Sequence, residues 1–294
     1  KSMRERKMLL NRRQMLRRSA LAMAALASAA NLVALGAAPE KRFRIGVCDW
    51  SIGKAGDPAA LEVAREIGLD GVQISPRTAE GLSLSQPEEQ QRYRETAKQT
   101  GVQVASIGIA ELNNVPYKSD ARAAQWVSDS IDAAAALGVR VVLLAFFHKG
   151  DLRGDKPGLD EVVRRLKQVV GKAEKAGVIL GLETWLSARE HLEILERVGS
   201  KSVQVYYDVC NSNDRGYDIY QEIRELGRER ICEFHAKENG ALLGRGKVDF
   251  QKVRAAMDAI DYRGWIQIEG AIPAGKPMLD AYKENCAFLR RIFS

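Results

Sequence analysis

The chain has 294 residues, of which 46% are hydrophobic and 28% are charged, so it can bury a full core within one domain. Residues 1–38 hold eight basic residues and one acidic residue, so they account for the whole formal net charge of +7 and leave the other residues neutral overall. A neutral body lacks the clustered positive surface that nucleic-acid binding requires, which argues against a nucleic-acid partner.

The N-terminal segment has the pattern of an export signal. Residues 11–17 read NRRQMLR and resemble the twin-arginine motif, and an Ala-rich apolar stretch follows at residues 20–38. A membrane anchor is the alternative, but the stretch is only weakly hydrophobic and ends in small residues that suit a signal peptidase. We therefore predict a signal peptide at residues 1–38 and a catalytic domain at residues 39–294. The protein is expected to be periplasmic or otherwise extracytoplasmic, without membrane contact after cleavage.

From residue 39 onward, short apolar or β-branched runs alternate with longer segments whose apolar residues recur at helical spacing. The alternation is typical of βαβ units on a parallel sheet. Eight strands are predicted, at residues 43–50, 71–76, 102–109, 139–148, 178–185, 203–211, 231–238 and 264–270. Helical segments between them include residues 58–68, 121–138 and 159–177. The expected fold is α/β, a closed (β/α)8 TIM barrel. A doubly wound open sheet is less favoured because no strand precedes a Gly-rich phosphate loop.

In such a barrel the loops that follow the strands gather at one end and carry function. The longest, expected to line the mouth, are residues 77–88, 110–120, 149–158 and 239–248. The four cysteines have no CxxC spacing that would indicate zinc or redox chemistry. Cys210 is predicted at the end of its strand and Cys232 at the beginning of its own, beyond disulfide reach. Together with Cys48 and Cys286, they are expected to be free and mostly buried thiols.

Four consecutive predicted strands end in side chains that can bind a metal, namely Glu183, Asp208, His235 and Glu269. Charged side chains inside apolar strands are costly to bury unless they are paired or bound to a metal. A strand-end salt bridge is the alternative for any one of them. Three carboxylates and one imidazole suit a single divalent cation, best Mn²⁺ or Mg²⁺, with Co²⁺ or Zn²⁺ as alternatives. We therefore predict one divalent-cation site.

These strand ends, with His-Ala-Lys-Glu at residues 235–238, resemble the pattern of the sugar phosphate isomerase/epimerase family of xylose-isomerase-like barrels. The resemblance covers the chain from about Phe43 onward. It implies that Glu183 and Glu269 also face the substrate from opposite sides as an acid/base pair. A cation that chelates a carbonyl and the adjacent hydroxyl acidifies the carbon between them, and two carboxylates can then move its proton from one face to the other. The expected enzyme is a metal-dependent isomerase or epimerase of a sugar or keto-sugar.

Two departures from the family pattern concern the substrate. Asn211 stands where family epimerases usually have His, and an apolar stretch at residues 240–243 replaces an Arg that usually follows the strand-seven His. Asn211 can still bond a hydroxyl, and we expect Arg245 to reach in from the loop. Both changes weaken epimerisation of a free ketose and favour the alternative of a lyase or hydratase acting on 3-keto-sugars or glycosides.

Further substrate-binding residues are predicted around this centre. Lys237 lies two residues after His235 and therefore points to the same face of its strand. His148 is predicted at the end of strand four, while Trp50 and Trp185 provide apolar walls at the ends of strands one and five. The remaining assignments are Glu238 as a supporting or salt-bridging residue, Trp126 in the core and His191 on the surface.

Two other functions compete with a sugar enzyme. Abasic-site endonucleases resemble this superfamily but use a three-zinc cluster rich in histidine, whereas this chain contains three histidines in all. A non-catalytic sugar-binding barrel is the other alternative, and the presence of both Glu183 and Glu269 argues against it. The sequence leaves the oligomeric state open.

Overall fold

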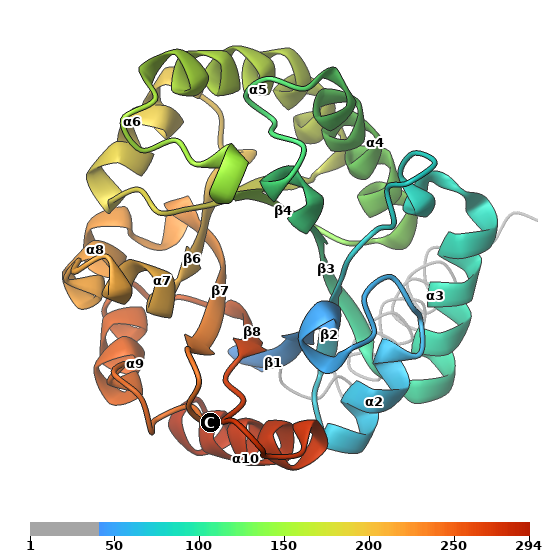
Figure 1. The fold of residues 1–294 in the computed structure, drawn as a ribbon, viewed down its shortest axis with the longest axis vertical. Helices are drawn as coiled ribbons and strands as arrows, with labels where there is room; N and C mark the ends of the chain where they lie inside the picture. Colours follow the sequence, from blue (N-terminus) through green and yellow to red (C-terminus); the bar gives the residue numbers. More distant parts are fainter. Residues whose placement is uncertain (1–40) are drawn as a thin grey trace, which may run out of the picture. The chain divides into compact units, whose positions relative to one another are not determined.

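Eight parallel strands form one closed barrel, in which each strand pairs with its neighbours in the chain and β8 closes onto β1 (Figure 1). The structure, a computed structural model, describes residues 41–294. The strands are β1 (Phe43–Cys48), β2 (Gly71–Ile74), β3 (Gln103–Ile109), β4 (Val141–Phe146), β5 (Ile179–Thr184), β6 (Val203–Asp208), β7 (Ile231–Glu238) and β8 (Gly264–Gly270). The predicted TIM barrel is confirmed. The predicted signal peptide lies outside the described residues and stays a prediction.

Helices surround the ring of strands (Figure 1). They are α2 (Ala60–Ile67), α3 (Pro87–Thr100), α4 (Ala121–Leu137), α5 (Lys156–Ala176), α6 (Ala188–Val198), α7 (Val209–Asp214), α8 (Ile219–Leu226), α9 (Phe250–Ala259) and α10 (Met278–Ile292). Short 3-10 turns are η1 (Asp49–Ile52), η2 (Ser83–Ser85), η3 (Ala110–Asn113), η4 (His148–Gly150) and η5 (Arg228–Arg230). Within residues 41–294, no helix is both long and apolar enough to cross a membrane.

Alternate residues of each strand point outward, where they pack with the helices in the main apolar core, and inward, where they fill the barrel. The outward layer includes Val47, Leu180 and Ile268, all fully buried. Trp126 on α4 is buried in the same core, as predicted. The four cysteines are free thiols, and three of them are buried, which confirms that prediction as well.

The interior of the barrel has an apolar side and a polar side. On β4 and β5 the inward residues form a separate apolar cluster that includes Val141, Leu143, Ala145 and Ile179. On β2, β3, β7 and β8, the inward residues are instead buried polar groups, namely Gln73, Ser106, Glu233 and Gln267. Buried polar groups need hydrogen-bond partners, so this side forms a connected network beneath the charged strand ends.

Candidate active site at the carboxyl ends of the strands

The four predicted ligands meet at one point. Potential ligand atoms of Glu183, Asp208, His235 and Glu269 all lie within 4.8 Å of one another, and the first three side chains are buried. Strand register produces this arrangement, since Asp208 pairs directly with His235 across β6 and β7. The sequence therefore identified residues that the fold brings together, while metal binding itself stays a prediction.

His235 directs one ring nitrogen toward the carboxylates. Its Nδ1 lies 3.0 Å from Glu183 Oε1, 3.6 Å from Glu269 Oε2 and 3.8 Å from Asp208 Oδ2. Its Nε2 lies 2.9 Å from Oε1 of Gln73. Burial alone would lower the pKa of His235, but its neighbours Cys48, Glu183 and Glu269 raise it. The neighbouring carboxylates thus favour the protonated ring, and a cation binding at Nδ1 would displace a proton from that nitrogen.

Gln73 is a functional residue that the sequence reasoning missed. Its amide nitrogen donates to Ser106 Oγ at 3.0 Å and to Tyr206 OH at 3.1 Å, so its carbonyl oxygen is the atom that faces His235. A ligating histidine usually has its second nitrogen held in this way. The available signal was a glutamine inside an apolar strand, which must find partners when buried.

Asp208 divides its two oxygens between the fold and the cluster. Oδ1 accepts the backbone N–H groups of Cys210 and Asn211, both at 2.8 Å, and so caps the N-terminus of α7. Oδ2 is buried and has no hydrogen-bond partner among the described residues. Burial raises the pKa of Asp208. Lys237 Nζ and His235 Nδ1 lie 3.7 and 3.8 Å from Oδ2, too far for a hydrogen bond. A buried carboxylate oxygen without a hydrogen bond, beside two further carboxylates and an imidazole, fits a divalent cation.

Glu269 is held at both oxygens. Its Oε1 accepts from Nε1 of Trp50 and its Oε2 from Nζ of Lys237, each at 2.9 Å. Burial alone would raise the pKa of Glu269, but His235 and Lys237 outweigh burial and lower it, which keeps the carboxylate ionised. Lys237 faces the barrel interior, as predicted. Trp50, expected only as an apolar wall at the end of strand one, lies in η1 and is a hydrogen-bond donor.

Gly108 on β3 makes room for the Trp50 ring. A Cβ atom at Gly108 would lie 2.9 Å from Cη2 of Trp50, closer than a side-chain carbon normally approaches. A larger residue would therefore push the indole away and break its bond to Glu269. Gly108 belongs to the site although it contacts no predicted ligand.

A cavity of about 310 Å³ lies against the cluster and has two chemically different sides. Glu183, Asn211, Lys237 and Glu269 line it with polar groups, while Leu143, Ala145, Phe147, Trp50 and Trp185 add apolar surface. A sugar presents hydroxyl groups and an apolar ring face, so this lining suits a small carbohydrate. His148 also lines the cavity, but it begins η4 after β4 has ended and is exposed, with a left-handed backbone (φ 49°).

Arg245 does not line the active-site cavity, so the prediction that it reaches in is wrong. It lines a separate cavity of about 160 Å³ together with Glu284 and Phe288 of α10. The reason is Glu238, whose buried carboxylate accepts the backbone N–H groups of Lys247 at 3.1 Å and Val248 at 2.9 Å. These two bonds fasten the loop to the end of β7. Glu238 thus supports the loop, with no salt bridge among the described residues.

The expectation that His191 lies on the surface is also wrong. His191 is only 3% exposed, on the same face of α6 as Ile194 and Leu195. Its Nδ1 donates to the Ser187 carbonyl oxygen at 3.0 Å, and its Nε2 lies 3.1 Å from Thr184 Oγ1. Thr184 directly follows Glu183, so His191 helps to fix the end of β5.

His191 should make the folded protein sensitive to acid. Burial lowers its pKa from 6.5 to about 4. Because the unfolded chain binds this proton first, the free energy of unfolding falls as the pH drops from 6.5 toward 4, by up to about 3 kcal/mol. Urea unfolding at pH 7 and pH 5 in EDTA should show a smaller loss for His191→Gln than for wild type. Exposed His148→Gln is the control, and an unchanged loss in His191→Gln would contradict the assignment.

The family profile described as "Xylose isomerase-like TIM barrel" matches residues 61–292. The chain belongs to this family. It is 24% identical to 2-epi-5-epi-valiolone 7-phosphate 2-epimerase of Actinoplanes sp. over 222 residues, 73% of this chain and 82% of that protein. D-psicose 3-epimerase of Enterocloster bolteae is 22% identical over 236 residues, 73% of this chain and 77% of that one.

The relatives also include a probable endonuclease 4 of Thermotoga maritima, which is 25% identical over 215 residues, 64% of this chain and 73% of that protein. Among solved structures, 3-keto-D-glucoside 4-epimerase from E. coli superposes with a TM-score of 0.71 at 18% identity, covering 85% of this chain and 99% of that one. At this identity the structural likeness shows a shared barrel fold.

Proposed function

We propose that this protein is a divalent-metal-dependent sugar epimerase or isomerase that moves a proton on the carbon next to a carbonyl group. The observation that carries the proposal is the placement of Glu183 and Glu269 around His235, against a cavity of mixed polar and apolar character. Two family relatives are named as epimerases of a sugar and of a sugar-like phosphate. Their chemistry requires the same two steps, removal and return of a proton.

The cation would be held by Glu183, Asp208, His235 and Glu269, and would supply polarisation of the substrate carbonyl, which acidifies the neighbouring C–H bond. Mn²⁺ or Mg²⁺ suits this oxygen-rich set best. The protein's own contribution is positional. A carboxylate has two oxygens, so Glu183 and Glu269 can each contribute one to the cluster and direct the other to the substrate carbon. One removes the proton and the other returns it.

The cavity supports a substrate with an extended apolar face. Phe147 and Trp185 pack with ring centroids 5.0 Å apart, beside Leu143 and Ala145. Asn211 lies on the polar side and is suited to a hydroxyl group. We propose 3-keto-glycosides and free ketoses as the substrates to test first. Elimination from a 3-keto-sugar, or its reverse, hydration of the unsaturated keto-sugar, remains the alternative reaction, because elimination begins with removal of the same acidic proton and hydration ends with its return.

The deciding experiment is incubation of the Mn²⁺-loaded protein with ketoses and 3-keto-glycosides in D₂O, followed by NMR. An epimerase or isomerase incorporates deuterium next to the carbonyl and yields an isomer of equal mass apart from the label. A lyase yields an unsaturated product, and a sugar-binding barrel yields neither. Absence of exchange with every substrate, at full metal occupancy, would remove the support for this proposal.

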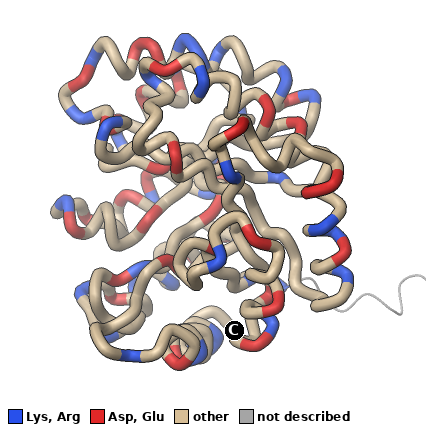
Figure 2. The backbone as a smooth tube through the Cα atoms, turned by 45° about the vertical axis from the view of Figure 1, so that its right-hand side comes forward, with Lys and Arg blue, Asp and Glu red and all other residues tan. Residues whose placement is uncertain are grey.

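An endonuclease is the second candidate that the comparisons raise. Of the three histidines, His235 alone lies in the cluster, since His148 is exposed in η4 and His191 is buried on α6. Within residues 41–294, the cluster that contains His235 is the single group of potential ligands that suits a metal. Figure 2 shows Lys and Arg positions interspersed with Asp and Glu positions along the backbone. These features favour a one-metal sugar enzyme.

Trp50→Phe removes the hydrogen bond to Glu269 but keeps an aromatic ring at this position. Loss of a hydrogen bond to a carboxylate costs about 1.5 to 3 kcal/mol, so we expect the exchange rate to fall about tenfold or more while the metal content stays constant. Trp126→Phe, in the buried face of α4, is the matched control. If Trp50→Phe exchanges at the wild-type rate, Lys237 alone suffices to hold Glu269.

A further inference from the structure

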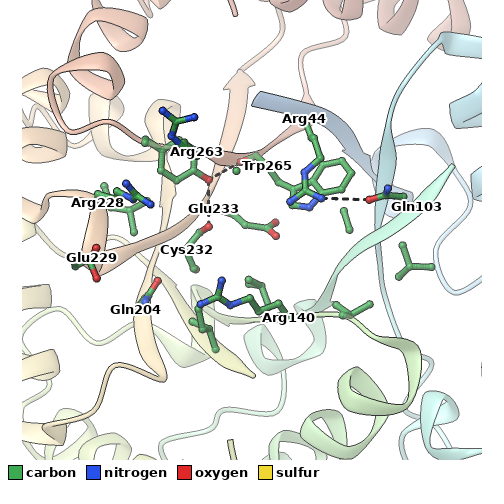
Figure 3. Close-up of a pocket in the computed structure, with 18 of the residues that line it drawn as sticks. Arg44, Gln103, Arg140, Gln204, Arg228, Glu229, Cys232, Glu233, Arg263 and Trp265 are labelled. Carbon is green, nitrogen blue, oxygen red and sulfur yellow. Dashed lines mark hydrogen bonds between the residues drawn. The ribbon is translucent and has the colours of Figure 1, made fainter. Parts of the chain in front are cut away.

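A second cavity lies at the amino ends of the strands, the opposite end of the barrel from the metal cluster (Figure 3). Its volume of about 410 Å³ falls within the range of small-molecule pockets. Residues near the beginnings of β1, β3, β4, β5, β6, β7 and β8 line it. This end of a TIM barrel ordinarily serves stability, so a pocket with charged walls there calls for a chemical explanation.

Four arginines line the cavity: Arg44, Arg140, Arg228 and Arg263. Arg44 stacks over the Trp265 ring at 4.5 Å and donates a long hydrogen bond of 3.4 Å to Gln103. Within the described residues, neither Arg44 nor Arg140 forms an ion pair. Arg228 and Arg263 share one carboxylate, that of Asp261, at 3.1 and 3.2 Å. The acidic residues that line the cavity are Glu229 and the buried Glu233. The rim thus has guanidinium groups without anionic partners.

Glu233 lines the same cavity and is 1% exposed. Its Oε2 accepts from Ser106 Oγ at 2.9 Å and from Tyr206 OH at 3.0 Å. Its Oε1 has no hydrogen-bond partner in the described part of the chain. Figure 3 shows the Glu233 side chain extending toward the middle of the surrounding residues. A buried acceptor of this kind lacks a donor, which a ligand hydroxyl group can supply.

We propose that this cavity binds a small oxyanion that also carries hydroxyl groups, such as a sugar phosphate or a sugar acid. Guanidinium groups bind phosphate and carboxylate through paired N–H bonds, so the anionic group would lie against Arg44 and Arg140. A hydroxyl group would donate to Glu233, which keeps the oxyanion away from the buried carboxylate. This site is separate from the metal cluster, and the inference does not depend on the proposed reaction.

Isothermal titration calorimetry of the Mn²⁺-loaded protein tests the site with four probes: glycerol 3-phosphate, glycerate, sulfate and glycerol. We expect saturable binding of one glycerol 3-phosphate or glycerate per chain, and the tighter of the two identifies the anionic group. Sulfate, which has no hydroxyl group, should bind at least about tenfold more weakly, and glycerol should not bind. Sulfate lacks the hydrogen bond from a hydroxyl group to Glu233, and glycerol lacks the anionic group that the arginines would bind.

Single-residue variants test where the hydroxylated anion binds. Arg44→Gln and Arg140→Gln should each weaken it about tenfold, whereas Arg189→Gln, an exposed arginine of α6, and Asp208→Asn in the metal cluster should leave it unchanged. The proposal is overturned if neither hydroxylated anion binds, if the Arg44 and Arg140 variants bind as wild type does, or if Asp208→Asn abolishes binding. Equal affinity for sulfate and glycerol 3-phosphate would also overturn it, because Glu233 would then have no role.

Discussion

Glu183→Gln and Glu269→Gln should each slow deuterium exchange into the substrate by about 10² to 10⁴-fold, the usual contribution of a positioned proton-transfer group. Glutamine keeps the shape of the side chain and one oxygen that can face the cation, but it removes the basic site. The rate is measured by NMR in D₂O, with metal content determined on the same samples. Glu222→Gln, a buried carboxylate that bonds the Ala188 backbone and Tyr207 outside the site, is the matched control.

The two variants also distinguish the faces of the substrate. If one carboxylate removes the proton and the other returns it, each variant should block exchange starting from one epimer more strongly than from the other. Exchange at the wild-type rate in metal-loaded Glu183→Gln and Glu269→Gln would contradict the acid/base assignment, whatever the substrate.

Asp208→Asn should weaken divalent-metal binding by about a hundredfold or more, since loss of supporting residues alone costs up to that much. Asparagine still caps α7, because its side-chain oxygen can accept the same two backbone N–H groups. Stability provides a second readout. At a metal concentration a hundred times its Kd, binding stabilises the wild type by about 2.7 kcal/mol, and the variant should lack this gain.

Thermal unfolding with Mn²⁺ and with EDTA measures the difference. Asp218→Asn is the matched control, because Asp218 caps α8 in the same way but lies outside the cluster. The control should respond to EDTA as wild type does. An Asp208→Asn protein that retains one tightly bound cation would rule out the predicted ligand set.

The sequence was most informative at positions where a charged side chain would be costly to bury. Charged residues at the ends of apolar strands have few structural explanations, and for that reason Glu183, Asp208, His235 and Glu269 could be found without a structure. The barrel itself followed from eight apolar runs separated by helical periodicity. The first, second, fourth, fifth and sixth predicted strands extend beyond the observed carboxyl ends. The chain leaves the sheet before Trp50, His148 and Trp185, and Asn211 lies in α7 rather than in β6. Apolar turn residues look like strand residues.

Residues whose role depends on another side chain could not be placed in this way. The bond from Trp50 to Glu269 joins β8 to a turn 219 residues earlier in the chain, and no local pattern predicts it. Glu238 binds the backbone of the loop that contains Arg245 and holds this loop away from the active-site cavity. These hydrogen bonds arise only after folding. His191 could have been recognised, since its spacing from Ile194 and Val198 places it on the buried face of α6.

Glu233 determines which groups donate and which accept in the chain of hydrogen bonds inside the barrel. Burial raises the pKa of Glu233 to about 7, and in its ionised form this carboxylate can only accept. The hydroxyl groups of Ser106 and Tyr206 then donate to it and accept from the Gln73 amide nitrogen. Gln73 then turns its carbonyl oxygen to His235, whose Nε2 must carry the proton. The nitrogen that His235 offers to a cation at one end of the barrel is thus selected by an acid near the other end.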